Sequence, residues 1–150
     1  MRSAQHVSFW IAGPPKAQPR VKATRRGSHA RVFTPGTADA WKAQVALACP
    51  DGFHAPAGHP VKLVLAFSFE HPKSHYGTGR NRGQLKARFA RARHVQVPDF
   101  DNLAKAVVDA LKGRLWADDC QSVDATISKQ WGRQGGVQIM AEIIEEEEQQ

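Results

Sequence analysis

The sequence predicts a single small α+β domain, with a mixed sheet of about four strands and two main helices packed on it. Three features support this fold class. Val61–Glu70 is the most apolar run in the chain, and its alternate residues are apolar, as expected of a central strand. Phe100–Leu111 has the apolar spacing of an amphipathic helix. Val123–Trp131 and Val137–Ile144 both alternate between apolar and polar residues, as half-buried strands do.

The first third of the chain is expected to form one strand, one basic loop and one helix. Val7–Ala12 is rich in residues that favour strands and stops at a Gly-Pro-Pro sequence. The segment 16–36 has no sustained period, so we expect a loop with a short hairpin around Arg26-Gly27. Thr37 is the expected N-cap of the first helix, which then runs to Ala48.

The last third is expected to form the second helix and a closing hairpin. The inward face of this helix consists of Leu103, Ala106, Val107, Ala110 and Leu111. Gly113 is placed to end the helix. The two final strands are expected to pair with each other through residues 132–136. We assign residues 1–144 to the domain and expect the acidic residues 145–150 to be a disordered tail.

Composition limits the classes of protein to which the chain can belong. Its 150 residues suffice for one modest core. No run approaches the roughly 18 apolar residues of a membrane-spanning helix, and no apolar signal sequence follows the N-terminus. The two cysteines, Cys49 and Cys120, lack the spacing of a disulfide framework or a metal site. We therefore expect a cytoplasmic protein with no membrane partner.

The charge distribution points to a polyanionic partner. The formal net charge is +7, and it is +12 for residues 1–140, which exclude the acidic tail. Residues 1–38 and 71–98 contain no acid, and each carries seven Lys or Arg residues. A solvated charged surface explains one such stretch, but two of them beside a cluster of carboxylates favour nucleic acid. The candidate DNA-binding residues are Lys16, Arg20, Lys22, Arg25, Arg26, Lys73, Arg80, Arg82 and Lys86.

Five acidic residues lie between Asp99 and Asp119 and form an acidic cluster in this basic chain. Asp99 and Asp101 are separated by one residue, so in extended backbone their carboxylates point the same way. Two adjacent carboxylates repel each other, and a bound Mg²⁺ removes that cost. Lys105, one turn later, would orient a phosphate or offset negative charge. If the turn at Asp118-Asp119 folds back beside the helix start, it completes a three-carboxylate metal site.

Each part of this cluster also has a purely structural explanation. Asp101 would be an N-cap, Asp101 and Lys105 would form an ordinary ion pair, and Asp118-Asp119 would be a turn. The coincidence of all three in one segment favours metal chemistry. Spacing alone, however, leaves both interpretations open.

The longer motif resembles the RusA family of Holliday-junction resolvases, which is common in phages and prophages. It consists of Pro98-Asp99-Phe100-Asp101-Asn102-Leu103-Ala104-Lys105, then Asp109-Ala110-Leu111, then Asp118-Asp119-Cys120-Gln121. Weaker similarity extends to Gly13-Pro14-Pro15, Pro19-Arg20 and Thr34-Pro35. The resemblance therefore spans nearly the whole chain.

The resemblance implies an endonuclease that depends on Mg²⁺, with Mn²⁺ as a substitute. It also implies a homodimer that places paired nicks across a four-way DNA junction. The implied catalytic residues are Asp99, Asp101, Lys105 and Asp119, and the implied metal ligands are Asp99, Asp101 and Asp119, with Asp118 in support. The segment 72–98 is longer than in the smallest family members, which leaves the fit of the substrate open.

Two other functions stay open. The same metal-dependent nuclease could act on flaps or replication forks. Alternatively, the chain could bind DNA without cutting it, and its carboxylates would then be structural. A comparison of four-way junctions, flaps and linear duplex distinguishes the first alternative. Exchange of Asp101 for Asn, which should remove cleavage but keep binding, distinguishes the second.

Overall fold

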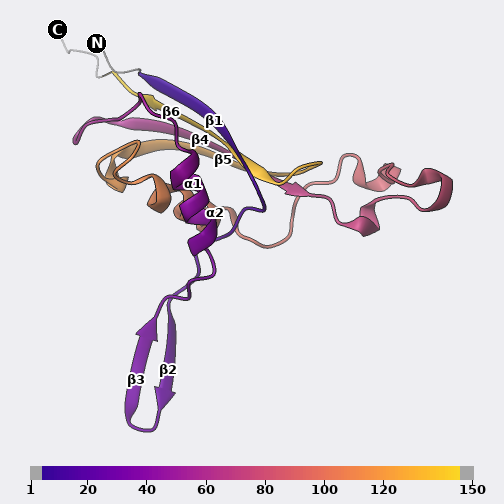
Figure 1. Cartoon of the computed structure of the whole chain (residues 1–150), viewed down its shortest axis with the longest axis horizontal. Helices are drawn as coiled ribbons and strands as arrows, with labels where there is room; N and C mark the ends of the chain where they lie inside the picture. The colour runs from indigo at the N-terminus through magenta and orange to yellow at the C-terminus, as the bar shows by residue number, and fades with distance from the viewer. Residues whose placement is uncertain (1–4, 146–150) are drawn as a thin grey trace.

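The structure has the expected α+β architecture, with one mixed sheet and two helices on one of its faces (Figure 1). It is a computed structural model in which residues 5–145 are described, so the expected tail lies outside the described residues except for Glu145. Its elements are β1 (His6–Ala12), β2 (Lys22–Arg26), β3 (His29–Phe33), α1 (Asp39–Ala48), β4 (Val61–Glu70), α2 (Phe100–Leu111), β5 (Ser122–Gly132) and β6 (Gly136–Ile143). No helix in this part of the chain has the length and apolar character needed to cross a membrane.

The four-stranded sheet has the order β1-β6-β4-β5, and β4 pairs in parallel with β5. The other neighbouring strands are antiparallel. Parallel neighbours need a crossover connection, and α2 lies in the crossover from β4 to β5. Because these strands share one direction, α2 runs back along them. The start of α2 therefore lies at their carboxyl ends, and its end lies near their amino ends.

The prediction that the last two strands form a closing hairpin is wrong. β5 and β6 are not neighbours, because β4 lies between them. The connection from Gly132 to Gly136 passes over the carboxyl end of β4, where Ser68 Oγ donates to the Gln134 carbonyl at 2.8 Å. A Cβ at Gly132 would overlap Ser68 Oγ, so a larger residue there would displace the hydroxyl that bonds Gln134. A short Gly-rich connection between two alternating segments is the usual sequence signal of a hairpin. Here β5 and β6 do not pair with each other, because each of them pairs with β4.

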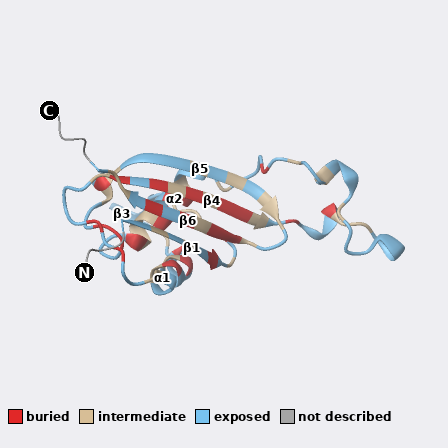
Figure 2. Ribbon diagram, turned by 90° about the horizontal axis from the view of Figure 1, so that it is seen from above, coloured by how far each residue is buried: buried red, intermediate tan, exposed pale blue. Residues whose placement is uncertain are grey.

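The bounds of the two helices and of β4 agree with the expectations, except at the start of α1. β4 and α2 have the predicted bounds, but the N-cap of α1 is Ala38 rather than Thr37. The backbone N–H of Asp39 bonds the Gly36 carbonyl at 3.2 Å, so a turn delays the helix start. Gly113 has a φ of 80° and follows α2 as expected. Buried residues gather in the central strands and on the helix faces opposite them (Figure 2). The largest include Trp41, Leu63, Leu65, Phe67, Leu103, Val107, Leu111 and Ile139.

Two basic segments project from the domain (Figure 1). The short hairpin expected around Arg26-Gly27 is confirmed as β2–β3, and every residue of both strands is exposed. The segment 71–98, called the basic arm below, extends from the carboxyl end of β4. It contains three short 3₁₀ turns rather than strands or long helices. Both projections are therefore built mainly from exposed residues outside the core.

Histidine and aromatic rings anchor the basic arm to the sheet. His71 stacks on Trp131 of β5 with ring centroids 5.5 Å apart, and His75 stacks on Phe89 with centroids 3.7 Å apart. The Nδ1 atoms of His71 and His75 lie 3.0 Å apart. Burial, and next the proximity of His75, lower the pKa of His71. The close contact requires at least one neutral ring, because a hydrogen bond needs an acceptor nitrogen.

The side chain of Gln121 joins separate segments at the amino end of β5. Its Oε1 accepts hydrogen bonds from the backbone N–H groups of Ala117 and Asp118, both at 2.9 Å. Its Nε2 donates to the carbonyls of Pro56 at 2.7 Å and His59 at 3.0 Å. The residue is only 4% exposed. This one amide therefore fixes the turn after α2 to the loop before β4.

Replacing Gln121 by Leu should lower the free energy of unfolding by at least about 2 kcal/mol, because buried backbone groups lose their hydrogen-bond partner. Gln130→Leu is the matched control, since Gln130 is an exposed glutamine in the strand that follows Gln121, β5. Its stability should stay within about 0.5 kcal/mol of the wild type. Urea unfolding measures both values. Equal stability of the two variants would contradict the role assigned to Gln121.

Candidate active site

Asp99 and Asp101 lie at the start of α2. Asp99 occupies the N-cap position in extended backbone (φ −70°, ψ 143°), but its side chain makes no capping hydrogen bond. Arg20 Nη2 lies 3.8 Å from Asp99 Oδ2. Asp101 is exposed in the first turn. Both carboxylates are thus displayed at a helix N-terminus, where the helix dipole favours negative charge.

Two of the structural explanations for this cluster are wrong. Asp101 is not the N-cap, because Asp99 occupies that position. In residues 5–145 the ion pairs join Arg20 to Asp99 and Lys42 to Asp109, and none joins Asp101 to Lys105. Lys105 is exposed one turn after Asp101. Within the described part of the chain, the side chains of Asp101 and Lys105 are therefore available to an ion or a substrate.

Contacts from two sides fix the start of α2. Lys129 Nζ of β5 donates to the carbonyls of Gln96 at 2.7 Å and Pro98 at 2.9 Å, just before the helix. On the other side, the backbone N–H of Gln18 donates to the Asn102 carbonyl at 2.9 Å. The segment after β1 thus runs along the first turn of α2. Strand β5 and this segment together position the aspartates.

The turn at Asp118-Asp119 is held at the other end of α2. Asp118 caps a 3₁₀ turn over Asp119–Gln121 and forms a capping box with Gln121. The hydrogen bond from the Cys120 backbone N–H, and next the charge of Lys112, lower the pKa of Asp118. The buried indole of Trp116 donates from Nε1 to Asp119 Oδ1 at 3.3 Å. The third structural explanation, that this dipeptide is an ordinary turn, is thus consistent with the structure.

One chain does not bring the two groups of aspartates together. α2 has 12 residues, so it is about 18 Å long. Asp99 and Asp101 lie at its start, whereas Asp118-Asp119 follows its end. Within residues 5–145 no group of three or more His, Cys, Asp or Glu side chains could hold a metal ion. The turn therefore does not fold back beside the helix start, which was the condition for a three-carboxylate site.

The basic candidates for DNA contact are all exposed and lie on or beside the two projections. The first group consists of Lys16, Arg20, Lys22, Arg25 and Arg26, and the group in the basic arm consists of Lys73, Arg80, Arg82 and Lys86. Lys86 Nζ also donates to the Ser74 carbonyl at 3.0 Å, so it helps to hold the arm together. Exposed cations on projecting segments suit contact with a phosphate backbone.

Two features of the site were not predicted from the sequence. Lys129 holds the start of α2, but this contact depends on the position of β5 and has no local sequence signal. Val95, Val97 and Phe100 are 88%, 82% and 56% exposed, so apolar side chains face solvent beside the aspartates. Phe100 precedes Leu103 by three residues, which is a spacing of the inward helix face, so periodicity gives no signal that its side chain is exposed.

Comparison with known proteins covers nearly the whole chain. The family described as endodeoxyribonuclease RusA matches residues 12–142, which include both projections, α2 and the turn at Asp118-Asp119. The chain is also similar to the uncharacterized protein YqaN of Bacillus subtilis (strain 168). The two are 29% identical over 137 residues, which is 89% of this chain and 94% of YqaN. The chain therefore belongs to the RusA endodeoxyribonuclease family.

Proposed function

We propose that this protein is a Mg²⁺-dependent endonuclease that cuts branched DNA and prefers four-way junctions. The observation that carries the proposal is the pair of exposed aspartates at the start of α2, in a chain with a net charge of +7. Membership of the RusA endodeoxyribonuclease family supports the same activity. The two basic projections fit a polyanionic substrate, because Lys and Arg displace counterions from DNA phosphates.

Asp99 and Asp101 fit the ligand chemistry of Mg²⁺. This ion prefers oxygen ligands and uses one or two carboxylates together with phosphate oxygens and water. Both side chains are exposed at one helix end, so an ion held there would be open to the DNA backbone. Bound Mg²⁺ would supply a Lewis acid that activates water and stabilises the leaving oxygen.

The side chains around these ligands would position the DNA. Lys105 is exposed one turn after Asp101, where its ammonium group would contact the scissile phosphate. The Arg20 side chain is 82% exposed beside Asp99, where its guanidinium would bind a neighbouring phosphate. Lys129 holds the backbone just before α2, so it keeps the aspartates in place without contacting the reacting atoms.

Asp119 would reach the site only from a second copy of the chain. It follows the end of α2, which is about 18 Å from the start of the helix. In a two-fold dimer with antiparallel α2 helices, the start of one helix lies beside the end of the other. The partner subunit's Asp119 would then complete each site. Two such sites share the two-fold symmetry of a four-way junction, which favours a homodimer.

Asp101→Asn should keep junction binding and lose Mg²⁺-dependent cleavage by about 100-fold or more, because a charged group at the reacting centre is removed. Gel shifts and cleavage of end-labelled junctions measure the two properties separately. Asp124→Asn is the matched control: it makes the same charge change at an exposed residue of β5 and should leave cleavage unchanged. Cleavage that survives in Asp101→Asn would refute the proposed site.

Cleavage rates on four-way junctions, flaps, forks and linear duplex of matched sequence should differ by about 10-fold or more in favour of four-way junctions. The reason is geometric, since only the junction presents two scissile phosphates related by a two-fold axis to a dimer. Equal rates on all substrates would refute junction selectivity. Faster cutting of flaps or forks would instead support a nuclease for other branched DNA.

Mixed dimers of Asp101→Asn and Asp119→Asn should regain nicking, although each variant alone is inactive. One site of the mixed dimer has all its wild-type residues if each site takes Asp119 from the partner subunit. Random mixing should give roughly a quarter of the wild-type nicking rate, with one strand cut per dimer. A mixture of Asp99→Asn with Asp101→Asn is the control, because both changes lie at the same helix end. This control mixture should stay inactive. If the mixture of Asp101→Asn with Asp119→Asn is also inactive, the shared site is contradicted.

A further inference from the structure

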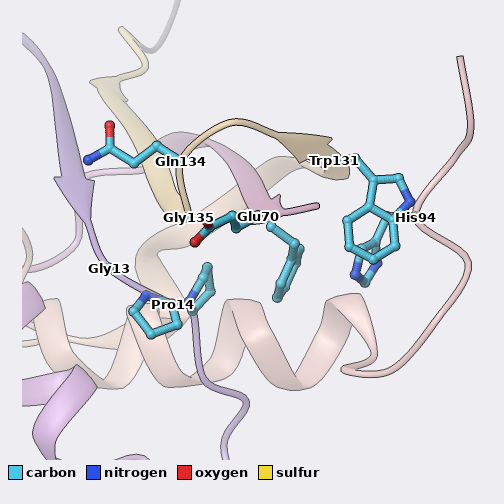
Figure 3. Close-up of a pocket in the computed structure, with 9 residues that line it drawn as sticks. Gly13, Pro14, Glu70, His94, Trp131, Gln134 and Gly135 are labelled. Atoms are coloured by element: carbon cyan, nitrogen blue, oxygen red, sulfur yellow. The ribbon is translucent and has the colours of Figure 1, made fainter. Parts of the chain in front are cut away.

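A cavity of about 500 Å³ opens at the carboxyl ends of the parallel strands β4 and β5 (Figure 3). Trp131 and His94 lie together on one side of it, and Gly13 and Pro14 lie on the other. Glu70, the last residue of β4, lies between these groups. The size is typical of sites for small ligands. The carboxyl ends of parallel strands are also the usual place for a ligand in such crossover units.

His94 has a polar atom that lacks a partner. The residue is 6% exposed, yet its Nδ1 makes no hydrogen bond to another described residue. The ring stacks on Phe69 with centroids 4.2 Å apart and lies 4.4 Å from the ring of Trp131. Burial, and next the charge of Lys129, lower the pKa of His94. The Nδ1 atom is itself covered by protein atoms, so His94 contributes an aromatic wall to the cavity rather than a polar contact.

The cavity lies beside the candidate carboxylates. Trp131 and Lys129 are two residues apart on the same face of β5, a separation of about 7 Å. Lys129 Nζ reaches the Pro98 carbonyl at 2.9 Å, just before the start of α2. On the opposite side, Pro15 lines the cavity, and the Gln18 backbone N–H bonds the first turn of α2. A nucleotide whose phosphate lies at the aspartates would therefore have its base near the cavity.

We propose that this cavity receives one unstacked nucleobase of the bound DNA, next to the phosphate that is cut. The inference rests on the proposed nuclease function. Trp131, which is only partly buried, lines the cavity with an aromatic surface on which any base can stack. The exposed Glu70 carboxylate provides hydrogen-bond acceptors for the edge of the base. A base at a branch point is the best candidate, because a base that is already unpaired is less costly to extrude than one in a duplex.

The carboxylate of Glu70 gives the cavity a chemical preference. An ionised carboxylate only accepts hydrogen bonds, so it favours bases that present an amino group. Thymine has no amino group and flanks its single N–H with carbonyl oxygens, which would face the carboxylate. The cavity should therefore favour adenine, cytosine or guanine over thymine.

Junctions in which single nucleotides near the crossover are replaced by an abasic analogue test the proposal. With the wild type, one position should lose cleavage by between about 5-fold and about 150-fold, the range that base–aromatic stacking supplies. With Trp131→Ala, the same replacement should change the rate by less than about 2-fold, because the stacking surface is absent. Trp131→Phe should keep the abasic effect, since an aromatic ring remains.

Trp10→Ala is the matched control for these variants. Trp10 is 42% exposed in β1, and its neighbour Ile11 faces the core, so Trp10 lies on the opposite face of the sheet. This variant should keep the full abasic effect. An intact junction that the wild type leaves uncut overturns the proposed nuclease function itself. If the intact junction is cut but no abasic position matters, or the effect persists in Trp131→Ala, the base-binding cavity is refuted and the nuclease function stands.

Glu70→Gln provides a second variant, because Trp131 also stacks on His71 and anchors the basic arm. At the position found in the abasic scan, the wild type should cut junctions with an amino-bearing base about 5-fold or more faster than junctions with thymine. Glu70→Gln should reduce this preference to less than about 2-fold, since an amide can also donate. Glu142→Gln, at an exposed residue of β6, should keep the preference. The same preference in Glu70→Gln as in the wild type would overturn the assignment of the cavity.

Discussion

The parallel pairing of β4 with β5 is the constraint on which the rest of this structure depends. Parallel strands cannot be joined by a tight turn, so the chain leaves the sheet after β4 and returns through α2. The direction of α2 follows from this path. It places the exposed aspartates and the cavity at the carboxyl ends of β4 and β5, and the Asp118-Asp119 turn at their amino ends. Gln121, just before β5, holds the turn that contains Asp118-Asp119, and Lys129 of β5 holds the segment that precedes α2.

The fold could be predicted from the sequence wherever the signals are local. The alternation in Val61–Glu70 and the helical spacing in Phe100–Leu111 gave both elements their bounds. Asp99, Asp101 and Lys105 could be placed at one helix end for the same reason. The neighbours of β5 and β6 could not be predicted, because a hairpin and a connection over the end of β4 have the same local sequence signals.

The relation between the two groups of aspartates depends on longer-range geometry. Whether Asp119 lies near Asp99 is decided by the direction in which the chain returns to the sheet, and motif spacing does not specify that direction. The cavity was equally inaccessible to sequence reasoning. Trp131 and His94 meet there only because the end of the basic arm packs against β5. Sequence therefore placed the candidate residues on their helices, strands and turns more reliably than it placed those elements relative to one another.

The position of the last strand has a consequence for how this protein is made. β1 has a single neighbour in the sheet, β6, and its register pairs His6 with Glu142 and Ala12 with Gly136. During synthesis β1 therefore has no sheet partner until β6 has been made. The unit formed by β4, α2 and β5 can assemble earlier, because its residues are contiguous. Emergence of β6 from the exit tunnel completes the sheet, and a nascent chain stalled before β6 would lack the pairings of β6 with β1 and β4.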